Sequence, residues 1–265
     1  MLVLQADCYY INPNQHHIIY PVKYSAYEEG TLSRYRSQLL FFFLCTFLCL
    51  IGFVSGLYVP KDINSGAFNS WIPAILTDLT LIVLFGIQHS IMARSWYKDL
   101  IKKWVPAPLE RSVYVCCASL VLFLMMYLWQ PVPYAIFDFR TSLAGSILRI
   151  TGLAGWLLVL VSTFLINHFD LFGLRQPYLY FTDKFPHELK FRLPFIYKII
   201  RHPIYLGFIT ACWFTPLMTT GHLLFAAGMT VYILIGIHFE ERDLLKEFPE
   251  YQAYRKRTGK LFPKL

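Results

Sequence analysis

The sequence predicts an all-α integral membrane protein, a bundle of six transmembrane helices with a cytosolic amphipathic helix at the C-terminus. Two properties of its 265 residues lead to this prediction, since 56% of them are hydrophobic and only 15% are charged. A soluble domain has about 25% charged residues. A third observation is that basic residues recur in every second interval between the apolar runs, which indicates a chain that crosses the membrane repeatedly.

Four apolar runs are long enough to cross a hydrocarbon core of about 30 Å, which takes roughly 20 helical residues. They occupy residues 38–59, 72–93, 112–130 and 144–167. A fifth apolar block, 203–239, is too long for one span and is interrupted near its middle by Pro216, Thr219, Thr220 and Gly221. Turn residues at this place predict two slightly short spans that form a tight hairpin. Residues 37–265 then make a single transmembrane domain, preceded by a polar lead, 1–36, to which the sequence assigns no role.

The distribution of basic residues predicts the orientation. Basic residues are frequent in the lead, in the segments after the second and fourth runs and in the C-terminal tail. The 60–71 and 131–143 loops have one basic residue each, Lys61 and Arg140. Because basic loops stay on the cytosolic side, we expect both termini in the cytosol. The net charge of +8 is then mainly a topology signal, with attraction to anionic lipid as a second effect, and nucleic acid is not an expected partner.

The C-terminal tail has the pattern of an amphipathic helix. Apolar side chains recur at helical spacing and basic ones fill the opposite side, which is typical of a helix that lies at a membrane interface. Pro249 is expected to break it. The apolar residues of this pattern are Leu244, Leu245, Phe248, Tyr251 and Tyr254.

Charged residues bracket the predicted hairpin at its two ends. Arg201 and His202 precede Pro203, which suits the first turn of a helix, and Glu240 and Glu241 follow the second span. A helix N-terminus beside a guanidinium can bind a carboxylate. Acids at a helix C-terminus oppose the macrodipole, so a cation must compensate them. Either a bound ligand or a salt bridge between the hairpin ends would do so, and we expect both clusters at the membrane surface.

Two histidines are candidates for proton transfer. His168 lies two residues before Asp170, and such an acid can fix the imidazole tautomer and raise its basicity; a hydrogen-bonded cap at the interface is the alternative. His89 lies three helical turns after Asp78 on the same face of the second span, where hydrogen bonding between helices is the ordinary use of such residues. The cysteines show no metal-ligand spacing, and five of the six lie within apolar runs, which favours inert thiols.

Several of these segments together resemble the isoprenylcysteine carboxyl methyltransferase and phospholipid methyltransferase superfamily of membrane enzymes. The segments in question are Arg201-His202-Pro203-x-Tyr205-x-Gly207, Glu240-Glu241-x-x-Leu244 and Leu261-Phe262-Pro263. Four longer segments are similar to bacterial methanethiol S-methyltransferases and, more distantly, to nurim and NnrU-type membrane proteins; these are residues 86–90, 110–114, 167–176 and 232–244. The resemblance covers residues 36–265, and the combination is specific although each motif alone is not.

This resemblance implies methyl transfer from S-adenosylmethionine to methanethiol, giving dimethyl sulfide and S-adenosylhomocysteine, in a bacterial inner membrane. It implies donor binding by Arg201, His202, Pro203, Tyr205, Gly207, Glu240 and Glu241, and catalysis by His168 with Asp170, or by His89. Tyr205 would hold the adenine end, and Gly207 would allow a close approach of the donor to the backbone.

The expected partners are therefore a small volatile thiol and membrane lipids, with no metal. Two other functions stay open from the sequence. One is methylation of a larger lipid-borne acceptor, such as a prenylated cysteine or a lipid amine. The other is a non-catalytic membrane protein of the nurim kind, although such a protein has no need of both charged clusters.

Overall fold

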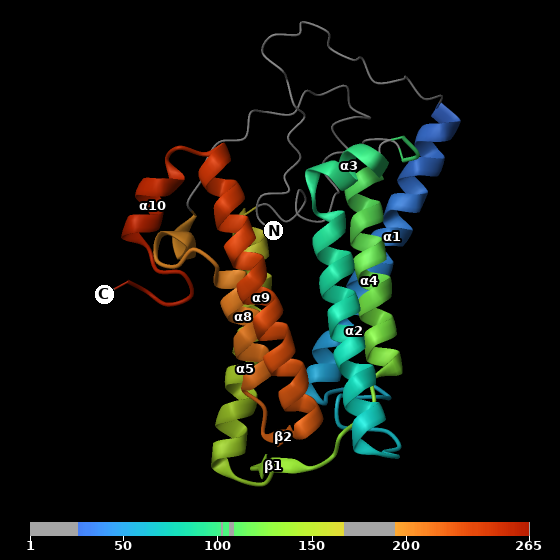
Figure 1. Ribbon diagram of the computed structural model, residues 1–265, viewed down its shortest axis with the longest axis vertical. Helices are drawn as coiled ribbons and strands as arrows, with labels where there is room; N and C mark the ends of the chain where they lie inside the picture. The colour runs from blue at the N-terminus through green and yellow to red at the C-terminus, as the bar shows by residue number, and fades with distance from the viewer. Residues whose placement is uncertain (1–25, 102, 106–108, 167–193, 265) are drawn as a thin grey trace, which may run out of the picture.

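The computed structural model describes residues 26–101, 103–105, 109–166 and 194–264. Within these ranges eight α-helices follow one another, with a short 3₁₀ helix, Phe195–Lys198, before α8 (Figure 1). They are α1 (Ala26–Ser55), α2 (Trp71–Met92), α3 (Ser95–Ile101), α4 (Glu110–Leu128), α5 (Leu143–Ile166), α8 (Pro203–Trp213), α9 (Thr220–Glu247) and α10 (Tyr251–Arg257). Two short strands, β1 (Ala135–Asp138) and β2 (Leu217–Thr219), complete the described secondary structure.

Five of the described helices are long and apolar enough to cross a membrane, namely α1 from Gln38 onward, α2, α4, α5 and α9. This confirms the prediction of an α-helical membrane protein. The first half of the predicted hairpin differs, because α8 has only 11 residues and rises about 16 Å. An irregular segment, Phe214 to Pro216, follows α8 and leads into β2.

The helices form two groups that α2 and α9 join. In Figure 1, α5, α8 and α9 lie on one side and α1, α2 and α4 on the other, and α2 packs against both α4 and α9. The closest crossing is that of α5 and α8, where a Cβ atom added at Gly207 would lie 2.7 Å from the Gly155 carbonyl oxygen. Only glycine tolerates such contact, and small residues commonly allow close helix packing in membranes.

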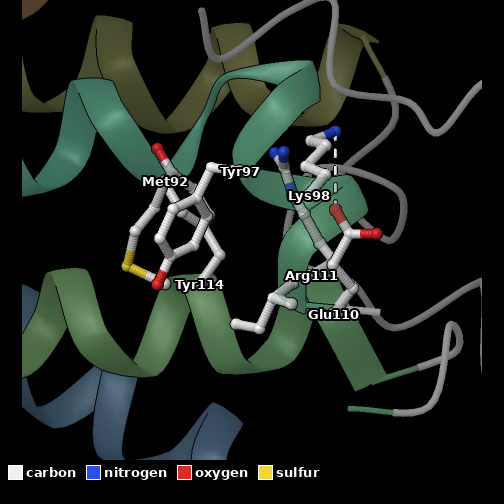
Figure 2. Close-up of a pocket in the computed structure, with 7 residues that line it drawn as sticks. Met92, Tyr97, Lys98, Glu110, Arg111 and Tyr114 are labelled. Carbon is white, nitrogen blue, oxygen red and sulfur yellow. Dashed lines mark ion pairs between the residues drawn. The ribbon is translucent and has the colours of Figure 1, made fainter. Parts of the chain in front are cut away.

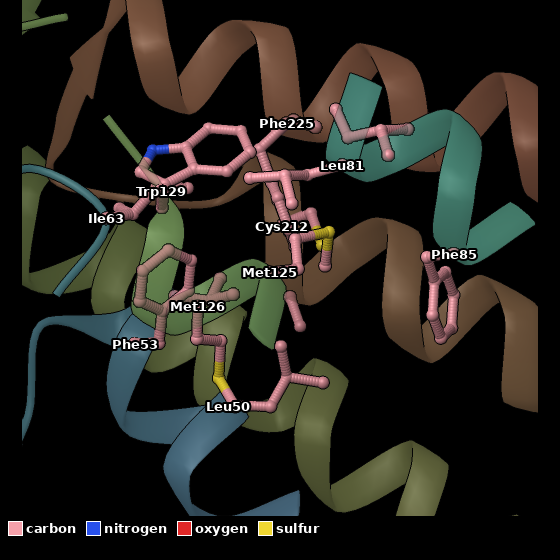
Figure 3. Packing of buried hydrophobic residues seen from close by; sticks show 14 of the residues in the cluster. Leu50, Phe53, Ile63, Leu81, Phe85, Met125, Met126, Trp129, Cys212 and Phe225 are labelled. Carbon is pink, nitrogen blue, oxygen red and sulfur yellow. The ribbon is translucent and has the colours of Figure 1, made fainter. Parts of the chain in front are cut away.

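The largest buried cluster lies where the two groups meet (Figure 3). Trp129, at the end of α4, is fully buried, and its ring stands edge-on to those of Phe53 of α1 and Phe225 of α9, with centroids 6.1 and 5.5 Å apart. Such edge-to-face contacts add to the burial of the rings. Met125, Leu81 and other apolar side chains fill the space around them. Three long helices are thereby fixed to one another at this level.

The two strands were not predicted, and they close one end of the bundle. β1 pairs antiparallel with β2, and the Phe139 amide donates to the Pro216 carbonyl at 2.8 Å. The weakly charged 131–143 loop thus lies beside the turn that joins α8 to α9 (Figure 1). Strands of three and four residues are too short to show alternation in a sequence, which explains why the pairing was missed. The opposite end carries α3, α10 and the C-terminus of α9.

The tail breaks where expected but does not lie apart from the protein. α9 continues to Glu247, and α10 begins at Tyr251, after Pro249. Tyr251 and Tyr254 form a buried cluster with Leu244, and the Tyr254 hydroxyl donates to the Tyr197 carbonyl. Burial raises the pKa of Tyr254 to about 12, so this hydroxyl keeps its proton. The apolar side of the tail is therefore covered by the chain itself.

Candidate active site

The two ends of the hairpin meet in a cluster of charges around Glu241, near the C-terminus of α9. Its Oε1 accepts from Nε of Arg201 at 2.8 Å and lies 3.1 Å from Nε2 of His202. Its Oε2 lies 3.5 Å from Nε of Arg255 in α10. The prediction that the ends of the hairpin come together is confirmed. The basic groups also supply the compensation that an acid at a helix C-terminus requires.

Backbone contacts place Arg201 and His202 at this position. His202 is the N-cap residue of α8, and Pro203 occupies the first helical position. The amides of Arg201 and His202 donate to the carbonyls of Gly259 and Lys260 at 2.9 and 3.1 Å. The segment before α8 is thus joined to the tail beyond α10.

The guanidinium of Arg201 also binds the tail. Its Nη1 donates to the carbonyls of Arg255, at 3.1 Å, and Thr258, so Arg201 links the start of α8 with α9 and the tail. Its side chain is only 7% exposed. The expectation that the charges at the hairpin ends lie at the surface was wrong, because the tail folds back and covers them.

Glu240 has a different environment from Glu241, although the two are neighbours in sequence. Its Oε2 accepts from the Tyr205 hydroxyl at 2.7 Å, and its side chain is 1% exposed. Tyr205 lies in the first turn of α8, and its ring centroid is 5.6 Å from that of His202. A buried carboxylate and a tyrosine therefore face each other beside the Glu241 cluster.

His202 also carries a buried atom that lacks a partner. Its Nδ1 forms no hydrogen bond within the described parts of the chain, and a buried polar atom in this state is energetically costly. In the same ranges, the bonds of Arg201 use Nε and Nη1 and leave Nη2 unused. The cluster thus retains polar atoms that a ligand can use.

Gly207 lies one turn after Pro203 and faces α5. A Cβ atom at this position would be 2.7 Å from the Gly155 carbonyl oxygen and 2.9 Å from the Val159 amide nitrogen. The packing of α8 on α5 is sufficient to explain a glycine here. The geometry therefore gives no support to the expectation that the donor approaches the backbone closely at Gly207.

His89 lies in a second polar pair on α2. The hydroxyl of Tyr114 is 2.7 Å from its Nε2, and the rings of Phe85 and Tyr232 lie nearby, with centroids 5.4 and 6.1 Å from that of His89. His89 is partly exposed in this structure. Asp78, expected on the same helix face, is buried and accepts from the Gln130 amide at 2.8 Å. His89 and Asp78 therefore both form hydrogen bonds with α4 or the residues just after it.

A small cavity continues from Tyr114 toward the N-terminus of α4 (Figure 2). Its volume is about 10 Å³, the space of a single water molecule. Lys98 lies 3.7 Å from Glu110 across it, and the buried guanidinium of Arg111 lies over the Tyr114 ring at 5.4 Å. A second cavity, of about 160 Å³, lies at the opposite end of α2, where Asn69, Ser70 and Thr77 line it. Neither is lined by a residue of the Glu241 cluster.

His168 and Asp170 lie outside the described residues, so their expected pairing stays a prediction. Sequence reasoning did not single out Arg255 or the carbonyl of Thr258, which complete the Glu241 cluster. No local pattern identifies them, because they reach the cluster only through the folding of the tail. Tyr114 and Tyr232 stood within the segments of the family resemblance but were not recognised as neighbours of His89.

Comparison with known proteins places the chain in a family. The methanethiol S-methyltransferase of Pseudomonas deceptionensis is 48% identical over 213 residues, which cover 80% of this chain and 81% of that one. The methanethiol S-methyltransferase of Mycobacterium tuberculosis is 43% identical over 222 residues, covering 83% and 91%. The chain belongs to the methanethiol S-methyltransferase family.

Nurim of Bos taurus is related to this family more distantly. It is 28% identical to the chain over 183 residues, which cover 64% of this chain and 68% of nurim. No family model matches the chain, and no solved structure matches it either.

Proposed function

We propose that the protein transfers the methyl group of S-adenosylmethionine to the sulfur of methanethiol, giving dimethyl sulfide and S-adenosylhomocysteine. The observation that carries the proposal is the identity of 43–48% to relatives named methanethiol S-methyltransferase over four-fifths of the chain. The charged clusters at the hairpin ends support it, because a non-catalytic membrane protein has no use for two buried sets of ionisable groups.

The residues at the hairpin ends fit the amino-acid part of this donor. Nη2 of Arg201 can donate to its carboxylate, as can Nδ1 of His202 when the imidazole is protonated. Glu240 supplies a carboxylate for its ammonium or ribose. Pro203 begins the helix whose first amides point toward such a ligand. Tyr205, bonded to Glu240, would lie at the adenine end. In this proposal Glu241 holds Arg201 and His202 in place, and it acts on the donor only through these two residues.

Methyl transfer to a thiol is an in-line displacement. A lone pair of the thiolate sulfur forms the new bond to the methyl carbon while the bond from that carbon to the sulfonium sulfur breaks. Positioning the reactants is the main task of the protein. A thiol is mostly protonated at neutral pH, so a base must take its proton. We assign this role to His168, oriented by Asp170, with His89 as the alternative within the described residues.

We also propose that the chain crosses a bacterial inner membrane six times with both termini in the cytosol. In this proposal α8 and the non-helical residues after it form the fifth crossing, and α9 forms the sixth. The pairing of β1 with β2 at one end of the bundle and the contact of Arg201 with Glu241 at the other support it, since residues 201–219 must then run from end to end. The basic intervals between the apolar runs favour the cytosolic side for the charged clusters.

The acceptor is tested by offering three substrates to the purified protein together with S-adenosylmethionine. Methanethiol should yield dimethyl sulfide in the headspace, whereas a prenylated cysteine and a lipid amine should accept little methyl. Transfer to either of these without dimethyl sulfide would favour the lipid-borne acceptor. Absence of transfer to all three, together with no binding of S-adenosylhomocysteine, would favour a non-catalytic protein.

A further inference from the structure

The tail that folds back onto the hairpin carries a set of exposed basic side chains. Residues 251–264 contain five basic residues and no acidic one. All five are exposed, namely Arg255, Lys256, Arg257, Lys260 and Lys264. Within the described ranges, Lys256 and Lys260 form hydrogen bonds only through their carbonyls, which accept from Nζ of Lys264 at 2.8 Å and from the His202 amide at 3.1 Å. The ammonium groups of Lys256 and Lys260 are therefore available to a partner outside the chain.

Large apolar side chains are exposed beside these charges. Phe262 is 71% exposed, although Leu261 before it packs against a buried cluster of α8 and α9. The 3₁₀ helix, to which the Tyr254 hydroxyl joins the tail, exposes Phe195 to 77%. Exposed aromatic side chains next to basic ones are typical of a protein surface at a membrane interface. We call Phe195, Phe262 and the side chains of Lys256, Arg257 and Lys260 the tail surface.

The tail surface lies beside the bundle and not beyond its end. Figure 1 shows the chain after α10 turning back along the bundle to the level of α8, below the end of α9. α8 packs along α5, which is one of the helices long and apolar enough to span a membrane. A basic surface at this place meets the phospholipid headgroups around the bundle before it meets a soluble partner. Anionic headgroups are the ones that complement its charge.

The same tail holds the residues at the start of α8. The carbonyls of Gly259 and Lys260 accept from the amides of Arg201 and His202, and the Thr258 carbonyl accepts from the Arg201 guanidinium. A change in the position of the tail therefore changes the position of Arg201 and His202. Because like charges repel one another, the basic residues gathered in the folded tail destabilise it when no anion is near.

We infer that the tail surface binds anionic phospholipid headgroups, and that this binding raises the affinity of the protein for its methyl donor. The inference rests on the proposed function and adds to it a membrane lipid that regulates the donor site. Headgroups beside Lys256 and Arg257 offset the repulsion within the tail. The tail then keeps Arg201 and His202 in the arrangement that binds the donor. Because such coupling is reciprocal, the donor also strengthens the binding of the lipid.

The test compares the full-length protein in two kinds of nanodisc, one of phosphatidylcholine alone and one of phosphatidylcholine and phosphatidylglycerol in equal parts. S-adenosylhomocysteine should bind about tenfold more tightly in the anionic nanodiscs, which is within the usual range for two coupled sites. High salt should remove most of this difference, because it screens exposed charges. Equal affinity in the two kinds of nanodisc would overturn the inference.

Two double variants distinguish the tail surface from the overall charge of the protein. Lys256→Gln with Arg257→Gln removes two charges of the tail surface, so its affinity for S-adenosylhomocysteine should be nearly the same in both kinds of nanodisc. Lys103→Gln with Lys246→Gln removes two exposed charges outside the tail and should keep the full difference. A tail variant that keeps the difference, or a control that loses it, would show that the lipid effect does not come from the tail surface.

The lipid contact is also measured without the donor. Lys256 and Lys260 should react with a water-soluble acetylating reagent more slowly in the anionic nanodiscs, whereas Lys246 should react at the same rate in both, as peptide mass spectrometry can show. Equal rates for Lys256 and Lys260 in the two lipids would overturn the inference. A protein that shows this protection but binds no S-adenosylhomocysteine in either lipid would instead refute the proposed function, and with it the effect on the donor, while the lipid contact would stand.

Discussion

At the scale of single residues, the two adjacent glutamates of α9 have different roles. Glu241 is held by Arg201, His202 and Arg255, whereas Glu240 accepts from Tyr205. Their adjacency in sequence predicted that both belong to the site, but not this division, which depends on how α8 and the folded tail approach α9. The burial of Arg201 also changes what its removal would do. Arg201→Ala would break contacts that join the start of α8 to α9 and the tail, so this variant cannot isolate donor binding.

Glu241→Gln is expected to destabilise the protein. The substitution leaves the buried Arg201 without its counter-charge, and breaking a buried pair in this way typically costs about 3–5 kcal/mol. Thermal unfolding in detergent should show a clearly lower Tm. Asp138→Asn is the control, since Asp138 pairs with Arg140 at an exposed position where water screens the interaction. Equal Tm values for the two variants would show that the Glu241 cluster does not hold the hairpin to the tail.

The assignment of the base predicts a particular pH dependence. His168→Ala should lower turnover by about 10²–10⁴-fold, the usual contribution of general-base catalysis, with little change in donor affinity. The loss should shrink as pH rises, because thiolate then forms without help from the protein. Asp170→Asn should show a smaller loss with the same trend. A loss that stays constant up to high pH would indicate a structural histidine, and His89→Ala would then be measured in the same way.

At the scale of elements, the crossing of α5 and α8 determines where the Arg201 segment lies. The crossing depends on Gly155 and Gly207, which let the two backbones touch. Gly155→Ala would place a Cβ atom 2.6 Å from the Ala211 amide nitrogen, and we expect a loss of about 1–3 kcal/mol in unfolding free energy, as for other overpacked interfaces. Ala154→Val, which enlarges an exposed position on the same helix, should have little effect. An unchanged Tm for Gly155→Ala in detergent would contradict the close crossing.

The hairpin itself could be predicted from the sequence, but its details could not. Apolar length and the turn residues after Pro216 located both of its halves, and the charges at its ends were correctly expected to meet. The shortness of α8 was missed, since the apolar run continues through residues that are not helical in the structure. The tail was predicted to be helical and broken near Pro249, and it is. Its return onto the hairpin depends on contacts such as that of Tyr254 with Tyr197, which no local pattern shows.

At the scale of the whole molecule, the bundle has two chemically different ends. One carries the paired strands and few charges, and the other carries the Glu241 cluster, α3 and α10 (Figure 1). A reporter fused after Leu265 and another inserted within 60–71 should therefore show opposite accessibility, with the C-terminal one in the cytosol. A C-terminal reporter on the outer side would reverse the orientation on which access to the donor depends.

The measurement that tests the account most directly follows the methyl group itself. The purified protein is given methanethiol and S-adenosylmethionine labelled in its methyl group. Dimethyl sulfide is then collected from the headspace, and its mass is measured by mass spectrometry. The account predicts one labelled methyl in every dimethyl sulfide molecule formed by the wild type. It predicts none from Glu240→Gln, whose Tm should remain close to that of the wild type, because the charge that Glu241 provides to its cluster is untouched. Unlabelled dimethyl sulfide, or full labelling by a folded Glu240→Gln protein, would contradict it.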